Sequence, residues 1–189
     1  MSHKNLSDLQ PWKTLKTKDV YVGEPWIKLS VEQILLPDGR VIDDYYQVQF
    51  IHCVVIYAET MDGKVIMERQ YKHGVKKITW TLPTGGIGKG EDPLLAAQRE
   101  FQEETGYVAD KWEAMGHFTQ MGNQGGGIVN LYRAYNARRV SDPVPSDLEE
   151  MDIVLMTRSE LMEAIQKGDI CILSTVTAIS MATNPEFTK

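Results

Sequence analysis

The sequence of 189 residues has only two cysteines and no long apolar run. Cys53 and Cys171 lie far apart and in no C-x-x-C pattern, which argues against a disulfide framework and a structural zinc site. No stretch approaches the roughly 20 apolar residues of a membrane-spanning helix. The first twenty residues also lack the apolar segment of a signal peptide. We therefore expect a cytoplasmic protein without a membrane partner.

An excess of positive charge is also missing. Lys and Arg number 20 against 26 Asp and Glu, which gives a net charge of −6. Affinity for nucleic acid comes from cations that neutralise phosphates, so we expect no nucleic-acid partner. A small anionic ligand remains compatible with this balance, because a divalent metal supplies positive charge locally. The four histidines form no H-E-x-x-H motif.

Turn signals and apolar alternation predict strands on both sides of one central helix. We expect a frayed or weakly docked start over residues 1–18 and β-rich segments over Val20–Gln49 around the turn Leu36–Gly39. Further strands are expected over Cys53–Ala58, Lys64–Arg69, Ile78–Leu82, Trp112–Thr119, Val129–Tyr135 and Ile153–Thr157, and helices over Pro93–Thr105, Ser159–Lys167 and Ser174–Ala182. Ser159 is the expected N-cap of its helix. This order favours an α/β fold in which helices cover a mixed sheet.

The central helix carries three acids on one face. Asp92 before Pro93 marks its start, and Gly106 marks its end. Glu100, Glu103 and Glu104 are spaced i, i+3 and i+4, so their carboxylates converge. Taken alone, such a cluster is compatible with a solvated helix face.

A glycine-rich loop, Thr84–Gly90, lies directly upstream of that helix. Its backbone can approach a ligand closely, and converging carboxylates are what a hard cation such as Mg²⁺ requires. The loop is not a Walker A motif, since Glu91 follows Gly90 where Lys would be needed. It does not fit G-x-G-x-x-G either, because Glu91 occupies the third glycine position.

Loop and helix together resemble the Nudix box, G-x5-E-x7-R-E-U-x-E-E-x-G-U, where U is a bulky apolar residue. Every fixed position is filled in register, by Gly85, Glu91, Arg99, Glu100, Phe101, Glu103, Glu104, Gly106 and Tyr107. Arg69–Lys72 and Trp80–Gly85 resemble the RQYR and WELPAG blocks of the ADP-ribose and nucleoside-diphosphate-sugar pyrophosphatase branch. The resemblance extends over residues 20–184. It implies a Nudix-type α/β/α sandwich with a mixed sheet (residues 50–189), preceded by a small β-rich segment (residues 1–49).

The resemblance implies Mg²⁺-dependent hydrolysis of nucleoside diphosphate sugars to a nucleoside monophosphate and a sugar phosphate, with Mn²⁺ able to substitute. It also implies a homodimer formed through the N-terminal strands. Thr81 and Thr84 replace the usual Glu and Ala, and no Pro follows the box until Pro143. These departures predict a substrate range beyond ADP-ribose, including ADP-glucose and GDP-mannose.

The box also implies roles for individual residues. Glu100 and Glu104 are the expected main metal ligands, with Glu103 bridging and the Thr84 carbonyl as a backbone ligand. Arg99 is expected to orient these acids, and Glu91 is expected either to pair with Arg99 or to cap the loop. For the general base we expect an acid from the late loop. Glu150 is the first candidate and Glu149 the second, while a solvated acidic loop is the alternative for each.

Substrate contacts are assigned more broadly. Arg69 and Lys72 are candidates for the diphosphate, or else form an exposed strand end. The Gly85 backbone is a further candidate. Trp26 and Tyr46 are candidates for stacking on the base; Tyr45 and Tyr46 alternate in a strand, so at most one of them can stack.

Two other functions remain open. One is a Nudix hydrolase that acts on nucleoside triphosphates or on RNA 5′ ends, which the acidic balance disfavours for long RNA. The other is an inactive module that only binds a nucleotide. Such modules usually lack one or more box carboxylates, whereas this chain has all of them.

Overall fold

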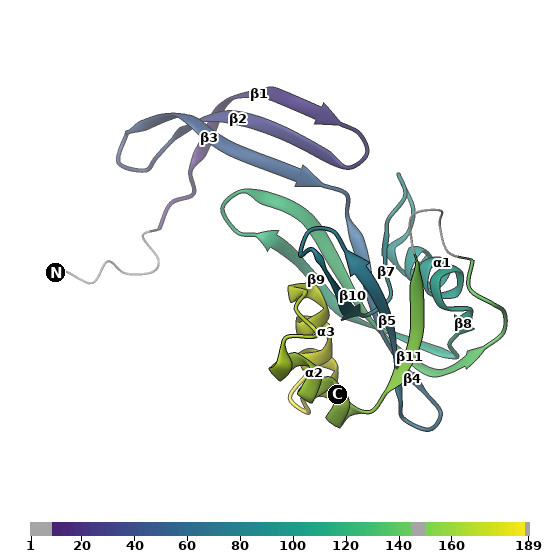
Figure 1. Ribbon diagram of the computed structural model, residues 1–189. Coiled ribbons are helices and arrows are strands. Elements are labelled where there is room, and N and C mark those ends of the chain that lie inside the picture. The colour runs from purple at the N-terminus through teal and green to yellow at the C-terminus, as the bar shows by residue number, and fades with distance from the viewer. Residues whose placement is uncertain (1–8, 145–149, 188–189) are drawn as a thin grey trace. The chain divides into compact units, whose positions relative to one another are not determined.

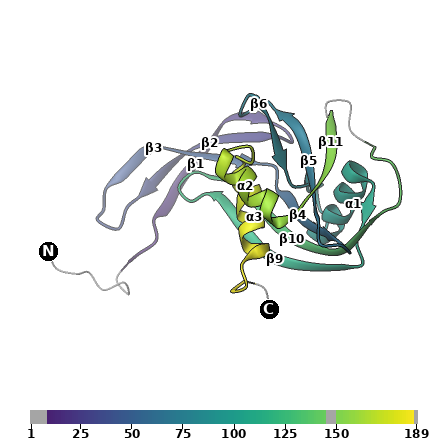
Figure 2. The ribbon, with the colours of Figure 1, turned by 60° about the horizontal axis from the view of Figure 1, so that its bottom comes forward.

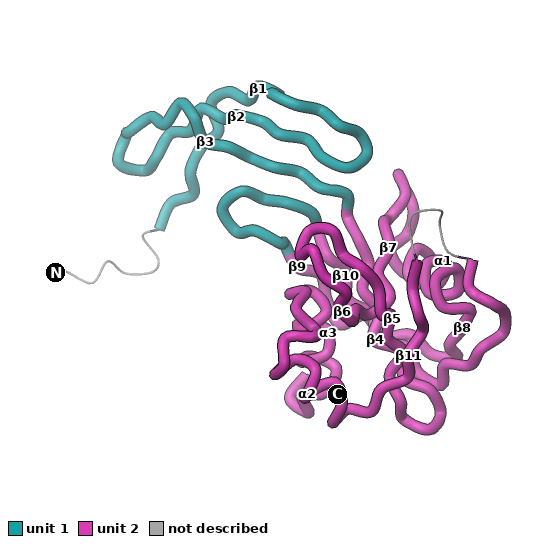
Figure 3. Tube along the Cα trace, viewed as in Figure 1, with its two compact units in different colours: residues 1–51, 119–127 teal, residues 52–118, 128–189 magenta. Residues whose placement is uncertain are grey.

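The computed structural model describes residues 9–144 and 150–187. The chain divides into two compact units, coloured separately in Figure 3. The first unit comprises the described residues up to Ile51 together with Thr119–Gly127. The second comprises His52–Phe118 and the described residues from Ile128 onward.

The first unit is built on an antiparallel meander of three strands (Figure 1): β1 (Lys13–Gly23), β2 (Ile27–Leu35) and β3 (Val41–Phe50). The expected frayed start is therefore wrong from Lys13 onward. Every β1 residue up to Val22 is exposed. The sequence therefore lacks the alternation of buried and exposed residues from which a strand is predicted. It is held by backbone pairing with β2, and the Thr14 hydroxyl adds a hydrogen bond of 3.2 Å to Glu32.

The tip of a later hairpin belongs to the first unit. Its strands are β9 (Lys111–Met121) and β10 (Gly125–Arg139). The Asn123 carbonyl in the connecting turn accepts hydrogen bonds from the Tyr45 hydroxyl at 2.9 Å and the Gln47 amide at 3.0 Å. These side-chain contacts fix the hairpin tip to β3.

The second unit has a mixed sheet, as predicted. Its remaining strands are β4 (Cys53–Thr60), β5 (Val65–Lys72), β6 (Lys77–Thr81), β7 (Thr84–Gly86), β8 (Tyr107–Val108) and β11 (Met151–Met156). β10 runs parallel to β4, whereas β5 pairs antiparallel with both β6 and β11. Residues Val54–Ala58 of β4 are fully buried, which is typical of a strand covered on both faces.

Helices cover the two faces of this sheet (Figures 1 and 2). α1 (Pro93–Thr105) packs Phe101 against a cluster that contains Val54, Ile56 and Ile66. α2 (Arg158–Lys167) and α3 (Leu173–Thr183) pack on the other face, against a cluster that contains Val55, Tyr57 and Met67. The predicted α/β/α sandwich is confirmed. Within the described residues, no helix is both long and apolar enough to cross a membrane.

The ends of α1 are the predicted ones. The Asp92 carboxylate accepts from the Leu94 and Leu95 amides, and Gly106 adopts a φ of 75° that favours glycine. The predicted N-cap of α2 is wrong by two residues, because Thr157 and not Ser159 caps the helix. The Thr157 hydroxyl and the Glu160 carboxylate bond each other's backbone amides, which completes a capping box.

Candidate functional site

The glycine-rich segment lies beside α1 within the second unit. β7 pairs antiparallel with β4, so Gly85 lies opposite Val54 in the register. The Thr84 amide donates to the Glu104 carboxylate at 3.1 Å, which joins β7 to the helix. Glu104 is 6% exposed, so this hydrogen bond satisfies a buried acceptor.

Gly85 allows a close approach that any other residue would block. A Cβ atom at this position would lie 2.0 Å from Glu100 Cδ, inside the volume of the carboxylate. The Glu100 carboxylate therefore packs directly against the backbone of β7 at Gly85. Sequence reasoning assigned Gly85 to substrate contact, whereas its packing partner here is a predicted metal ligand.

Arg99 joins the acids of this region through all three guanidinium nitrogens. Nε and Nη2 contact the two Glu91 oxygens at 2.9 and 3.0 Å. Nη1 donates to Glu100 at 2.8 Å and to Glu103 at 3.1 Å. Nη2 also donates to the Gly86 carbonyl at 3.2 Å, a contact that no sequence motif indicated. The guanidinium is thus shared among three carboxylates and the glycine strand.

This network keeps Glu91 ionised. Hydrogen bonds from Arg99, and then from the Gly88 amide at 2.7 Å, lower the pKa of Glu91 to about 2. The hydrogen bonds that Arg99 makes to Glu91, and then to Glu100 and Glu103, raise the pKa of Arg99 further above its ordinary value. Both groups therefore carry full charge at neutral pH, and the fork geometry of the guanidinium fixes their relative orientation.

The predicted metal ligands share one region but face different partners. Glu100 and Glu103 face Arg99, while Glu104 faces the Thr84 amide. Their exposure also differs, since the Glu103 side chain is 52% exposed and that of Glu100 is 17% exposed. Across residues 9–144 and 150–187, no three acidic, histidine or cysteine side chains are arranged as in a cation site.

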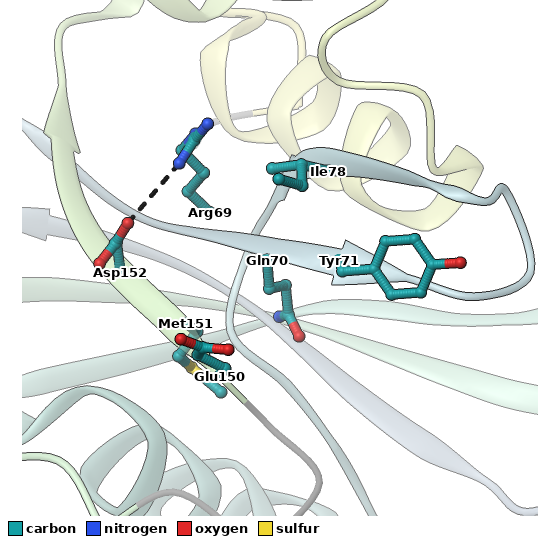
Figure 4. Close-up of a pocket in the computed structure, with 7 residues that line it drawn as sticks. All are labelled: Arg69, Gln70, Tyr71, Ile78, Glu150, Met151 and Asp152. Atoms are coloured by element: carbon teal, nitrogen blue, oxygen red, sulfur yellow. Dashed lines mark ion pairs between the residues drawn. The ribbon is translucent and has the colours of Figure 1, made fainter.

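A second feature of this unit is a pocket of about 400 Å³ around the start of β11 (Figure 4). It is lined by Arg69, Gln70, Tyr71, Ile78, Glu150, Met151 and Asp152. Glu150 thus lies at the pocket, and Glu149 falls outside the described residues. Arg69 points toward Asp152, with 3.7 Å between its Nη1 and a carboxylate oxygen. Sequence reasoning missed Ile78, Met151 and Asp152, for which no motif was available.

The two basic residues proposed for the diphosphate lie on opposite faces of β5. Val65 and Met67 pack toward α2 and α3, and Ile66 packs toward α1. Because side chains alternate along a strand, Arg69 lies on the same face as Val65 and Met67, and Lys72 lies on the same face as Ile66. The strand period alone would have shown this difference.

A cluster of buried polar side chains lies on the face of β5 that is directed toward α1. The Gln70 amide donates to Glu68 at 2.9 Å and to Thr81 at 3.2 Å, and all three residues are buried. Thr81 is one of the two departures from the related sequence block. Here its hydroxyl helps to satisfy an amide that would otherwise be costly to bury.

The aromatic candidates belong to the first unit. Trp26 is 68% exposed and Tyr46 is 53% exposed. Tyr45 is half-buried, donates to Asn123 and meets Trp12 edge-on at 5.6 Å. Tyr45 and Tyr46 thus differ in exposure, as alternation along a strand predicts.

Comparison with known proteins places these features in a family. The NUDIX domain profile matches residues 50–173, and the profile of the nucleoside diphosphate sugar hydrolase N-terminal domain matches residues 12–48. A solved structure described as an ADP compounds hydrolase has a TM-score of 0.75 at 19% identity. That match covers 90% of this chain and 91% of the other, and it shows a shared fold.

Two relatives match over most of their length. The chain is 30% identical over 168 residues to the methanol dehydrogenase activator of Bacillus methanolicus. It is 27% identical over 168 residues to the ADP-ribose pyrophosphatase of Bacillus subtilis. Each match covers 88% of this chain and 90% of the relative. Together with the box residues around α1, these matches show that the chain belongs to the Nudix hydrolase family.

Proposed function

We propose that the protein hydrolyses the diphosphate bond of nucleoside diphosphate sugars of the ADP-ribose type. The products are a nucleoside monophosphate and a sugar phosphate. The observation that carries this proposal is the group of Glu100, Glu103 and Glu104 beside Gly85, with Arg99 among them. The match of residues 12–48 to the N-terminal domain of nucleoside diphosphate sugar hydrolases supports the substrate class.

The donor set suits Mg²⁺, with Mn²⁺ as a substitute. Carboxylate and carbonyl oxygens are the ligands that these cations prefer, and Gly85 leaves room for Glu100 against the backbone. Glu100 and Glu104 would be the main ligands, with Glu103 bridging and the Thr84 carbonyl adding a backbone oxygen. When bound, the cation offsets the charge of the diphosphate and lowers the pKa of the attacking water.

Other residues would bind substrate and move the proton. Glu150 borders the pocket at the start of β11 and is our first candidate for the general base, with Glu149 as the second. Arg69 lines the same pocket as Glu150 and would contact the diphosphate there, beside Asp152. Lys72 lies at the end of β5, on the α1 side by strand alternation, and is the other candidate cation for the diphosphate. Trp26 and Tyr46 would stack on the base.

A substrate panel tests this function. The purified protein is given ADP-ribose, ADP-glucose, GDP-mannose, UDP-glucose or a nucleoside triphosphate with Mg²⁺, and the phosphate products are identified. We expect nucleoside monophosphate from at least one sugar nucleotide, and a loss of several powers of ten in turnover for Glu104→Gln. Preference for the triphosphate would favour the alternative of a Nudix hydrolase that acts on nucleoside triphosphates. Turnover that survives Glu104→Gln would refute the metal-ligand assignment.

The first unit has the features of a dimerisation segment, and we propose that residues 1–49 form one. Among its described residues, Ile34 is the one buried apolar side chain. Leu15, Val20 and Val22 of β1 are each more than two-fifths exposed. A long exposed edge strand with apolar side chains is a site for pairing with a second copy. Light scattering during gel filtration should give twice the chain mass, and a monomer at micromolar concentration would contradict the proposal.

A further inference from the structure

A further pocket of the second unit lies on the face of the sheet that α2 and α3 cover. It has a volume of about 230 Å³ and lies between β6, β11 and α2. Val154 and Met156, which line it, pack with the cluster on this face, whereas α1 packs on the opposite face. Among the described residues that line this pocket, none is assigned a role in the proposed reaction. A ligand bound here would therefore be distinct from the substrate.

The walls of this pocket are apolar and include one aromatic ring. Met156 and Ala164 are buried, while Trp80 and Val154 are half-buried. The volume is smaller than the roughly 300 Å³ at which pockets begin to accept drug-sized ligands. The pocket therefore suits a short aliphatic chain, and the face of a tryptophan ring attracts a cation at the end of such a chain.

The rim of the pocket is charged and mostly acidic. Glu160, Glu163 and Asp169 lie there together with Lys167, which leaves two negative charges in excess. Glu163 pairs with Lys167 along α2. Hydrogen bonds from the Thr157 amide, and then from its hydroxyl, lower the pKa of Glu160, so this carboxylate is ionised at neutral pH.

Asp169 is held at the rim by its main chain. Its carbonyl accepts hydrogen bonds from the Trp80 amide at 3.1 Å and from the Thr79 hydroxyl at 2.6 Å. These bonds place Asp169 beside β6 without using its carboxylate, and the residue is exposed. An acid and an aromatic ring are thus fixed next to each other at one pocket.

We propose that this pocket binds a short aliphatic diamine. Two ammonium groups match the two excess negative charges of the rim, and the methylene chain lies against the apolar walls. A protein partner fits less well, because charged residues are depleted at the core of protein interfaces. Leu155 is the one exposed apolar residue among the described residues that line the pocket.

Nuclear magnetic resonance of the full chain tests the proposal. 1,4-Diaminobutane is titrated at constant pH and ionic strength, while the indole N–H signal of Trp80 and the methyl signal of Ala164 are followed. We expect both signals to shift and to saturate with a dissociation constant on the order of 1 mM, since each exposed ion pair adds little. 1-Aminobutane has one charge fewer and should bind about fivefold more weakly, and 1-butanol should give no saturable shift.

The wild-type titration alone can refute the proposal. Absence of a saturable shift at Trp80 and Ala164 up to about tenfold above the expected dissociation constant would overturn it. Equal binding of 1-butanol would refute the role of charge. Shifts confined to signals of α1 would show that the diamine binds the acids of the box instead. Tighter binding of N-acetyl-arginine amide would assign the pocket to a protein side chain and refute a free amine.

Two charge variants test the rim directly. Lys167→Gln raises the excess to three negative charges and should bind the diamine about threefold more tightly, whereas Asp169→Asn should bind it about threefold more weakly. Lys28→Gln is the matched control, because Lys28 is a part-exposed lysine of the first unit that pairs with Asp19, and its affinity should equal that of the wild type. Weaker or unchanged binding by Lys167→Gln would contradict the proposal.

Discussion

Replacing Gly85 by alanine tests whether the close approach of Glu100 to β7 matters for catalysis. The added Cβ would lie 2.0 Å from Glu100 Cδ and 2.4 Å from its Oε2, whereas ordinary contact begins at 3.4 Å. The carboxylate must therefore retreat by 3.4 − 2.0 = 1.4 Å. Gly85 is not among the glycines with positive φ, so its backbone tolerates an alanine. The perturbation acts on the acid and leaves the strand in place.

The expected loss follows from that displacement. A misplacement of about 1 Å in a catalytic arrangement costs on the order of 100-fold in rate, or about 2.7 kcal/mol of transition-state stabilisation. We therefore expect turnover of ADP-ribose by Gly85→Ala to fall by at least about 100-fold. The free energy of unfolding should change by less than about 1 kcal/mol, because the atoms that move are the end of a flexible side chain. Released phosphate and urea unfolding measure the two quantities.

Two further variants test whether the clash with Glu100 causes the loss of turnover in Gly85→Ala. Gly74→Ala is the matched control, since a Cβ there meets no atom within 4 Å and its φ is ordinary, so both quantities should stay at the wild-type value. In a Glu100→Ala background the clash is gone, and Gly85→Ala should then cost less than about threefold in further turnover. Wild-type turnover of Gly85→Ala, or an undiminished loss in the double variant, would refute the reasoning.

Other expectations concern stability. Because contacts in the folded state lower the pKa of Glu91 from 4.5 to about 2, its stabilising effect is complete above pH 4.5 and is lost as the pH falls toward 2. The difference in melting temperature between the wild type and Glu91→Gln should shrink over that window; a constant difference would contradict the assignment. Thr157→Ala should destabilise the protein by about 1 kcal/mol in urea, and Ser159→Ala by less than about 0.5 kcal/mol. The reverse order would contradict the observed cap.

The sequence predicted best where local chemistry decides the structure. The bounds of α1 follow from Asp92, Pro93 and Gly106, whose effects act within one helical turn. The grouping of the box acids on one face follows from their spacing along the same helix. The start of α2 is also encoded locally, because Thr157 and Glu160 form the capping-box pattern, whereas Ser159 has a typical capping side chain but is already inside the helix.

Prediction failed where distant segments decide the structure. β1 has no buried residue up to Val22, so its pairing with β2 leaves no apolar pattern in the sequence. The pocket around β11 joins Arg69 and Ile78 to residues about seventy to eighty positions later, through strand pairings that no local motif encodes. The bond from Arg99 to the Gly86 carbonyl likewise depends on how β7 passes the helix.

The acids of α1 are stabilised in two different ways, and this division explains how one helix carries all of them. Glu100 and Glu103 both accept hydrogen bonds from Arg99, whose positive charge lowers their mutual repulsion. Glu104 is buried, where an ionised carboxylate is costly unless it is hydrogen-bonded, and the Thr84 amide supplies such a bond. A side-chain substitution can remove Arg99, but it leaves the Thr84 amide in place. Glu104 therefore depends on the backbone of β7, whereas Glu100 and Glu103 share one side-chain partner.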